Sequence, residues 1–300
     1  MTRIICLGMV VKDIVFYVQQ IPSTPQKLTA HSYEEKFGGM AATAAAAIAA
    51  LGGSVEFWGS VGDDEIGRNA IEAFGLCGVL TKIKQIQNAH SAISAVIVDG
   101  DGERMLAVYP GKLEPTADWL DLESLKGVNA VHADFRWVAG AKTLYLAAKK
   151  LNIPRVLDAD AGDISALKEL IPLANHVIFS QPGLALFTGG LELGEGLHFA
   201  SQFTEGIIGV TLGEKGSLFL DNEKIYEFSA PQILPVDTNG AGDVFHGAYS
   251  LAIGRGLTWM DAAKYASSAA ALKCSKVGGW QHLPTHSEVI NLLGNSSCLN

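Results

Sequence analysis

The 300-residue sequence is poor in cysteine, poor in charge and without a long hydrophobic run. Its four cysteines have no spacing typical of a metal site, so we interpret them as free thiols in a reducing compartment. The longest stretch of small apolar residues, 40–51, is mostly alanine and too short to cross a bilayer. No cleavable signal is recognisable near the N-terminus. We therefore expect a cytoplasmic protein with no membrane-spanning helix.

Charged residues make up only 18% of the chain, hydrophobic residues make up 48%, and the net charge is −9. This negative balance argues against nucleic acid or an anionic membrane as the main partner. Any anionic substrate would need local positive side chains. The length and apolar content fit one large domain with a sizeable core.

Two common nucleotide-binding motifs are also absent. No P-loop pattern of two glycines followed by Lys-Ser/Thr occurs. The pair Gly240 and Gly242 lacks a third glycine, because Phe245 stands there, and no strand–acid pattern surrounds it. A Rossmann dehydrogenase is therefore not expected.

Apolar runs predict buried strands at the following residues: 4–7, 55–58, 130–132, 155–157, 176–179 and 207–211. Helical periodicity follows several of them, as at 141–151, and three helices are predicted after residue 240, at 240–254, 259–274 and 287–293. This alternation predicts an α/β fold, a mostly parallel sheet covered by helices on both faces. The half-exposed runs 15–18, 28–33, 93–98 and 103–109 do not fit that scheme, and we expect them to form a small accessory sheet.

The most informative segment is 237–243, DTNGAGD, which leads from a loop into a helix. A helix N-terminus with two glycines can bind an anion, and Asp243 would lie beside that anion. Such a cradle next to a base suits phosphoryl transfer to a hydroxyl. A glycine-rich turn before an ordinary acidic first turn would give the same pattern. A second double glycine, Gly38-Gly39, precedes an alanine-rich helix, and residues 211–216, TLGEKG, form a turn between two strands.

In this order, these motifs resemble the PfkB (ribokinase-like) carbohydrate kinase family over nearly the whole chain. The resemblance implies a three-layer ribokinase-like domain spanning 1–300, with lid segments at about 14–36 and 91–110. It also implies ATP with Mg²⁺ as the phosphoryl donor and a homodimer formed through the lid sheet.

The resemblance assigns roles to matching residues. Asp243 would be the general base, with a low pKa beside the helix N-terminus. Gly240, Ala241 and Gly242 would hold the transferring phosphoryl group. The sugar would meet Asp13, Gly38, Gly39 and Thr43, and the nucleotide would be bordered by Ser180, Thr211, Gly213, Gly216 and Ser267.

Three departures from the family pattern change what is expected. Thr43 stands where the family usually has asparagine, which alters one sugar contact. The usual Asn-x-x-Glu motif reads SQPG from Ser180 onward, so the family's glutamate near Mg²⁺ is missing. Many relatives bind K⁺ near the catalytic loop around Asp237, and here the ammonium of Lys273 could replace that ion or could simply be a solvated helix lysine.

Two cations bear on the choice of sugar. Lys27 precedes the predicted strand at 28–33, and Arg136 follows a strand end, where a cation can bind an anionic substrate tail. Several motifs are similar to the 6-deoxy-6-sulfofructose kinase branch, which phosphorylates the 1-hydroxyl of a sulfonated sugar. The alternatives are a kinase for fructose, ribose, a phosphosugar or a nucleoside, and a non-catalytic regulator on the same fold.

Overall fold

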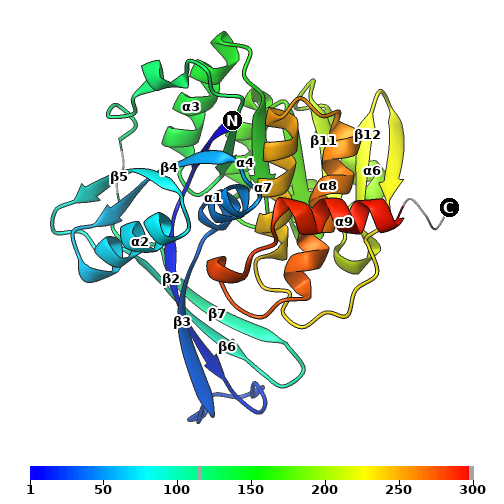
Figure 1. The fold of residues 1–300 in the computed structure, drawn as a ribbon. Helices are drawn as coiled ribbons and strands as arrows, with labels where there is room; N and C mark the ends of the chain where they lie inside the picture. The colour runs from blue at the N-terminus through cyan, green and yellow to red at the C-terminus, as the bar shows by residue number, and fades with distance from the viewer. Residues whose placement is uncertain (114–115, 297–300) are drawn as a thin grey trace.

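The computed structural model describes residues 1–113 and 116–296 (Figure 1). A nine-stranded sheet forms its centre, with strand order β13-β12-β11-β10-β9-β8-β1-β4-β5. All neighbouring strands are parallel except β12 and β13, which close one edge as an antiparallel hairpin. The strands are β1 (Arg3–Leu7), β4 (Ser54–Gly62), β5 (Leu80–Ile86), β8 (Ala130–Asp134), β9 (Arg155–Ala159), β10 (His176–Ser180), β11 (Ile207–Thr211), β12 (Ser217–Asp221) and β13 (Lys224–Phe228).

Helices cover both faces of this sheet and bury two separate cores. In β1, Ile4 and Cys6 belong to one core and Ile5 and Leu7 to the other, because successive side chains of a strand point to opposite faces. The first core is covered by α1 (Met40–Ala50), α2 (Glu65–Leu76), α7 (Ala241–Gly254), α8 (Trp259–Cys274) and α9 (His286–Ser296). The second is covered by α3 (Val138–Lys150), α4 (Ile164–Leu170), α5 (Gln181–Thr188) and α6 (Leu193–Ser201). The predicted three-layer α/β fold is confirmed.

Small side chains bring α1 and α7 unusually close together at the centre of the molecule. The alanines of α1 are nearly all buried. A Cβ added to Gly247 on α7 would lie 2.5 Å from the Ala44 carbonyl oxygen, well inside van der Waals contact. This tight packing fixes the N-termini of two helices, α1 and α7, beside each other.

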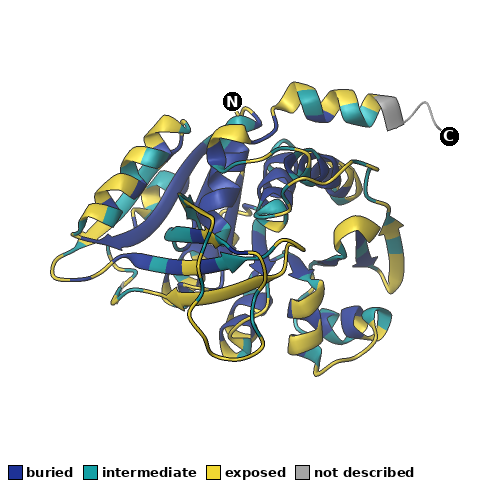
Figure 2. Ribbon diagram, turned by 90° about the horizontal axis from the view of Figure 1, so that it is seen from below, coloured by how far each residue is buried: buried dark blue, intermediate teal, exposed yellow. Residues whose placement is uncertain are grey.

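A separate four-stranded sheet projects from the main body, in the order β3-β2-β6-β7 (Figure 1). Its strands are β2 (Val11–Tyr17), β3 (Ser32–Gly38), β6 (Ala92–Val98) and β7 (Arg104–Tyr109). The strand predicted at 28–33 was misplaced, since β3 begins only at Ser32. The edge strand β7 is exposed along its whole length, in contrast to the buried central strands (Figure 2).

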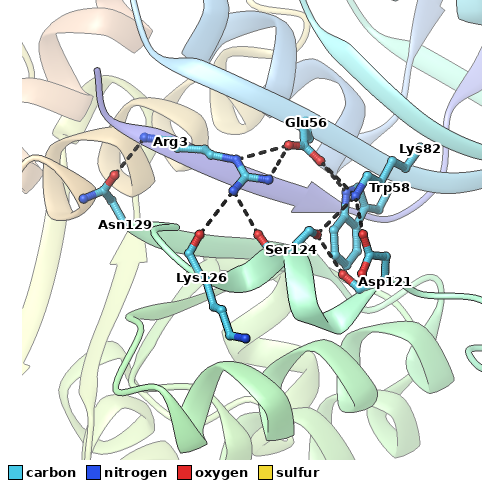
Figure 3. Close-up of polar contacts among 8 residues, drawn as sticks. All are labelled: Arg3, Glu56, Trp58, Lys82, Asp121, Ser124, Lys126 and Asn129. Atoms are coloured by element: carbon cyan, nitrogen blue, oxygen red, sulfur yellow. Dashed lines mark hydrogen bonds and ion pairs between the residues drawn. The ribbon is translucent and has the colours of Figure 1, made fainter.

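A polar network joins β1, β4 and β5 to the short 3₁₀ helix η1 (Leu122–Leu125) (Figure 3). The Glu56 carboxylate, only 8% exposed as a residue, accepts from the Arg3 guanidinium at 2.5 Å and from Trp58 Nε1 at 3.2 Å. Arg3 also donates to the Ser124 carbonyl at 2.9 Å, and Lys82 binds Asp121 at 3.1 Å. Because each buried polar atom here has a partner, the network stabilises this edge of the sheet.

Within the described residues, no helix is long and apolar enough to cross a membrane. Cys6, Cys77 and Cys274 are free thiols, and Cys298 lies outside the described part of the chain.

Candidate active site

A cavity of about 550 Å³ opens between the small sheet and the carboxyl ends of the central strands. This is the usual position of ligand sites in open α/β sheets. The small sheet contributes Asp13 and Lys36, the start of α1 contributes Gly39, and the ends of β8 and β9 contribute Asp134 and Asp158. The whole segment 237–243 lines the cavity as well. Residues far apart in the sequence therefore meet at one site.

The N-terminus of α7 opens into this cavity. Gly240 is its N-cap residue and has a left-handed φ of 74°, and no side chain in the described part of the chain caps the helix. The first helical hydrogen bond runs from Val244 N to Gly240 O, 3.0 Å. The Ala241 N–H is directed to Thr238 O at 3.3 Å, so the N–H groups best placed for an anion are those of Gly242 and Asp243.

Asp243 lies in the first turn of α7 and lines the cavity, to which it is partly exposed. Burial raises the pKa of its carboxyl well above the usual value, and the neighbouring Asp158 carboxylate raises it further, although His246 opposes this. The low pKa predicted from the helix N-terminus is therefore wrong. A raised pKa makes Asp243 a stronger proton acceptor, as suits a general base.

Asp13 and two glycines form the end of the cavity beneath the small sheet. A Cβ on Gly38 would lie 2.4 Å from Asp13 Oδ2, so only glycine allows that carboxylate its position. Gly39 has a φ of 104°, and a Cβ there would lie 2.3 Å from the Met9 carbonyl oxygen. Burial raises the pKa of Asp13, while the Ser94 hydroxyl and the Lys36 ammonium lower it.

Thr43 is 7% exposed and lines the cavity from α1. Its hydroxyl accepts from Trp280 Nε1 at 3.1 Å, which leaves the hydroxyl proton able to donate into the cavity. Trp280 itself stacks on Phe74 with ring centroids 4.9 Å apart. Position 43 is thus held rigidly, by a tryptophan that sequence reasoning did not single out.

The two cations predicted to bind an anionic tail have different surroundings. Arg136 lines the cavity, and its guanidinium lies over the Phe135 ring at 5.0 Å. Lys27 is exposed in the connection between β2 and β3 and is not among the residues that line the cavity. The cation that the small sheet does bring to the cavity is Lys36.

A second cavity, of about 540 Å³, adjoins the first and shares Thr211, Thr238, Ala241 and Gly242 with it. It brings together Thr211, Gly213, Gly216 and Ser267, four of the five residues predicted to border a nucleotide. The fifth, Ser180, lines the first cavity, where it caps α5 and donates to Asp160 at 2.5 Å. The two cavities therefore meet at the start of α7.

Lys273 is not a solvated helix lysine. It is 3% exposed, and its ammonium donates to the carboxylate of Asp237 at 3.1 Å and to the carbonyl oxygen of the same residue at 3.2 Å. The Lys273–Asp237 pair ties the end of α8 to the segment that leads into α7.

Sequence reasoning missed six polar residues that line the cavity: Lys36, Ser94, Asp134, Asp158, Asp160 and His246. Asp158 and Asp160 follow the buried run 155–157, where polar residues at a strand end would have been a usable signal. His246 carries no such signal, because it stands within the helical run after Asp243.

The chain matches the model of the pfkB family carbohydrate kinases over residues 1–286. The chain belongs to the PfkB family of carbohydrate kinases. It is 26% identical to a ribokinase of Arabidopsis thaliana, over 97% of this chain and 80% of that protein. It is 27% identical to a fructokinase of Vibrio alginolyticus, over 86% of this chain and 91% of that protein.

Solved structures agree with this assignment. A protein of Agrobacterium tumefaciens that carries the provisional name ribokinase superposes with a TM-score of 0.92, at 31% identity and 98% coverage of both chains. An Arabidopsis thaliana ribokinase in complex with ribose and ATP has a TM-score of 0.85 at 25% identity, over 97% of this kinase and 98% of that chain. This kinase is thus a phosphotransferase with a ribokinase-like fold.

Proposed function

We propose that this kinase transfers the γ-phosphoryl group of ATP to a sugar hydroxyl held between Asp13 and Asp243. The observation that carries the proposal is the meeting of two cavities at Ala241 and Gly242, next to Asp243, which lines the first cavity. The sugar would occupy the cavity under the small sheet, and the nucleotide would occupy the cavity beside Thr211 and Ser267.

In the proposed reaction, Asp243 accepts the proton of the attacking hydroxyl. The sugar oxygen forms a bond to the γ-phosphorus while the bond between that phosphorus and the β–γ bridging oxygen breaks, and ADP leaves. The N–H groups of Gly242 and Asp243 stabilise the charge on the transferring group. Gly240 turns the chain so that these N–H groups face the cavity.

Mg²⁺ would enter with the nucleotide. The described residues contain no group of three or more ligating side chains suited to a metal. The segment from Ser180 to Gly183 also lacks the glutamate of the family's Asn-x-x-Glu motif. Mg²⁺ needs few protein ligands when phosphates and water complete its octahedron, so this site fits an ion bound mainly by ATP. Bound there, Mg²⁺ would neutralise phosphate charge.

For the acceptor, we propose a sugar with an anionic tail, 6-deoxy-6-sulfofructose, phosphorylated at its 1-hydroxyl. Arg136 supports this choice, because it lines the cavity and is an exposed residue. A permanently charged guanidinium suits a sulfonate, which stays ionised at any physiological pH. A neutral sugar is the second candidate, because the relatives include ribokinase and fructokinase.

Arg136→Ala separates the two candidates. With the sulfonated sugar we expect kcat/KM to fall about tenfold, the size of one charge-assisted hydrogen bond at an exposed arginine, while kcat/KM for fructose stays unchanged. Lys142→Ala, a surface lysine on the following helix paired with Glu169, is the matched control. Equal losses on both sugars, or no turnover of the sulfonated sugar by the unaltered enzyme, would refute the anionic tail.

We also propose that the Lys273 ammonium takes the place of the monovalent cation that many relatives bind. Its two contacts with Asp237 stabilise the segment before α7 as an ion would.

The small sheet acts as a lid in this account, because Arg104 on β7 donates to Thr238 Oγ1 at 3.0 Å and to Asn239 Oδ1 at 3.3 Å. A homodimer through this sheet and a cytoplasmic location remain further proposals.

A further inference from the structure

His246 lies on α7 one turn after Asp243, and it is 2% exposed. Its Nδ1 lies 2.8 Å from the Gly242 carbonyl oxygen and 3.3 Å from Asp158 Oδ2. Its Nε2 lies 3.1 Å from the Ile178 carbonyl oxygen on β10. The reaction proposed above makes no use of this ring.

Both ring nitrogens of His246 face oxygen atoms that can accept a proton but, as backbone carbonyls, cannot donate one. A neutral imidazole has one N–H and one lone pair, so it would direct a lone pair at one of the carbonyls. A protonated Asp158 would not remove the conflict, because Nδ1 would still face Gly242 O without a proton. Only the imidazolium, with two N–H groups, satisfies both nitrogens.

The surroundings of the ring have opposing effects on the pKa of His246. On balance the pKa of His246 is lowered, chiefly by burial, although the two carbonyl hydrogen bonds and the carboxylates of Asp243 and Asp160 raise it. Burial and the carboxylates of Asp160 and Asp134 raise the pKa of Asp158 well above its usual value, whereas an imidazolium 3.3 Å from Asp158 Oδ2 would form a pair of zero net charge with its carboxylate. The geometry of both hydrogen bonds favours the charged form of this pair.

The remaining charged groups nearby come from β8 and the loop after it: His132, Asp134 and Arg136. The ring centroids of His132 and His246 are 6.4 Å apart. Ser250 donates its hydroxyl proton to the His246 carbonyl, so His132 Nδ1 must donate to Ser250 Oγ, and its Nε2 stays unprotonated. Burial lowers the pKa of His132 to about 3, so this ring is neutral, and the charge of His246 rests on its two carbonyl contacts.

We propose that His246 is a protonated positioning residue that holds and polarises the peptide between Gly242 and Asp243. The Gly242 carbonyl and the Asp243 N–H belong to one planar peptide and point in opposite directions. A cationic donor on the Gly242 carbonyl makes the Asp243 N–H on the other side a stronger hydrogen-bond donor. This N–H lies in the first turn of α7 and faces the cavity. The inference rests on the proposed function, in which this N–H stabilises the transferring phosphoryl group.

Nitrogen-15 NMR of histidine-labelled enzyme tests the protonation state without any turnover. The His246 signals are assigned from the spectrum of His246→Asn. We expect both ring nitrogens to show the shifts of N–H groups throughout the range of about pH 6 to 8. A shift typical of an unprotonated nitrogen anywhere in this range would overturn the proposal.

Kinetics of two conservative variants test the positioning role. Asparagine places an amide N–H near the position of Nδ1, and glutamine places one near Nε2. His246→Gln should lower kcat about tenfold or more, less than loss of a direct oxyanion donor, with the KM for ATP nearly unchanged. His246→Asn should keep more of kcat than His246→Gln.

The control is His176→Asn, which removes a half-buried ring that contacts α7 through the Tyr249 hydroxyl at 3.0 Å. It should leave kcat near that of the unaltered enzyme. Equal kcat values for His246→Asn and His246→Gln would contradict the role assigned to Nδ1. If the unaltered enzyme turned over no sugar, the proposed function would fail, while the NMR result would still decide the charge of His246.

Discussion

The buried pair of Lys273 and Asp237 offers a quantitative test of how the segment before α7 is held. Lys273→Met keeps an unbranched side chain as far as Cε but removes the charged Nζ. Removing one partner of a fully buried ion pair costs about 3–5 kcal/mol. The Asp237 side chain is 20% exposed, so water can partly replace the lysine, and we expect the free energy of unfolding to fall by about 2–3 kcal/mol.

In a chain of this length such a loss lowers Tm by about 3–5 °C, which calorimetry or circular dichroism would detect. K⁺ should restore part of the stability and of kcat to Lys273→Met, because the ion can occupy the position of the ammonium. The unaltered enzyme should not respond to K⁺. Lys276→Met is the control, since Lys276 makes a surface ion pair with Glu288, worth about 0–1 kcal/mol.

Two results would refute this reasoning. An unchanged Tm in Lys273→Met would show that the pair does not stabilise the segment. A lowered Tm and kcat with no response to K⁺ would show that Lys273 supports the fold without taking the place of a cation.

Three further predictions concern other parts of the molecule. Glu56→Ala should lower the free energy of unfolding by about 2–4 kcal/mol in denaturant titrations, because it strands the buried Trp58 N–H and the Arg3 guanidinium, and an undiminished midpoint would contradict this. Arg104→Ala should raise the KM for the sugar in steady-state assays by loosening the contact of β7 with Thr238, and an unaltered KM would count against the lid. The pH profile of kcat/KM should lose activity as pH falls through the raised pKa of Asp243, because the base must be ionised, and an acid limb near the usual aspartate pKa would disagree.

The central fold was predictable because buried parallel strands are continuous apolar runs. The run 4–7 became β1, and the run 207–211 became β11 without any change of boundary. β5, with the sequence LTKIKQI, was missed because an edge strand alternates polar and apolar residues. β3 was misplaced for a related reason, since SYEEKFG lies in a half-exposed sheet whose position is set by pairing with β2.

At the site, glycine positions were predictable because they depend on local backbone geometry. Gly39 and Gly240, which both have a positive φ, are such positions. The shift in the pKa of Asp243 was not predictable, because burial and the carboxylate of Asp158, on a strand distant in sequence, raise this pKa. The charge assigned to His246 likewise depends on a carbonyl of β10 that no motif indicates.

The most direct test of the central claim is sugar-dependent ATP turnover by Asp243→Asn. Asparagine has nearly the same shape as aspartate but accepts no proton at neutral pH, so we predict a fall in kcat of about a hundred- to ten-thousandfold. Nucleotide affinity, measured by calorimetric titration of ADP, should stay within a few-fold of the unaltered enzyme. If Asp243→Asn kept most of its kcat, Asp243 would not be the base, and the mechanism proposed for this site would be wrong.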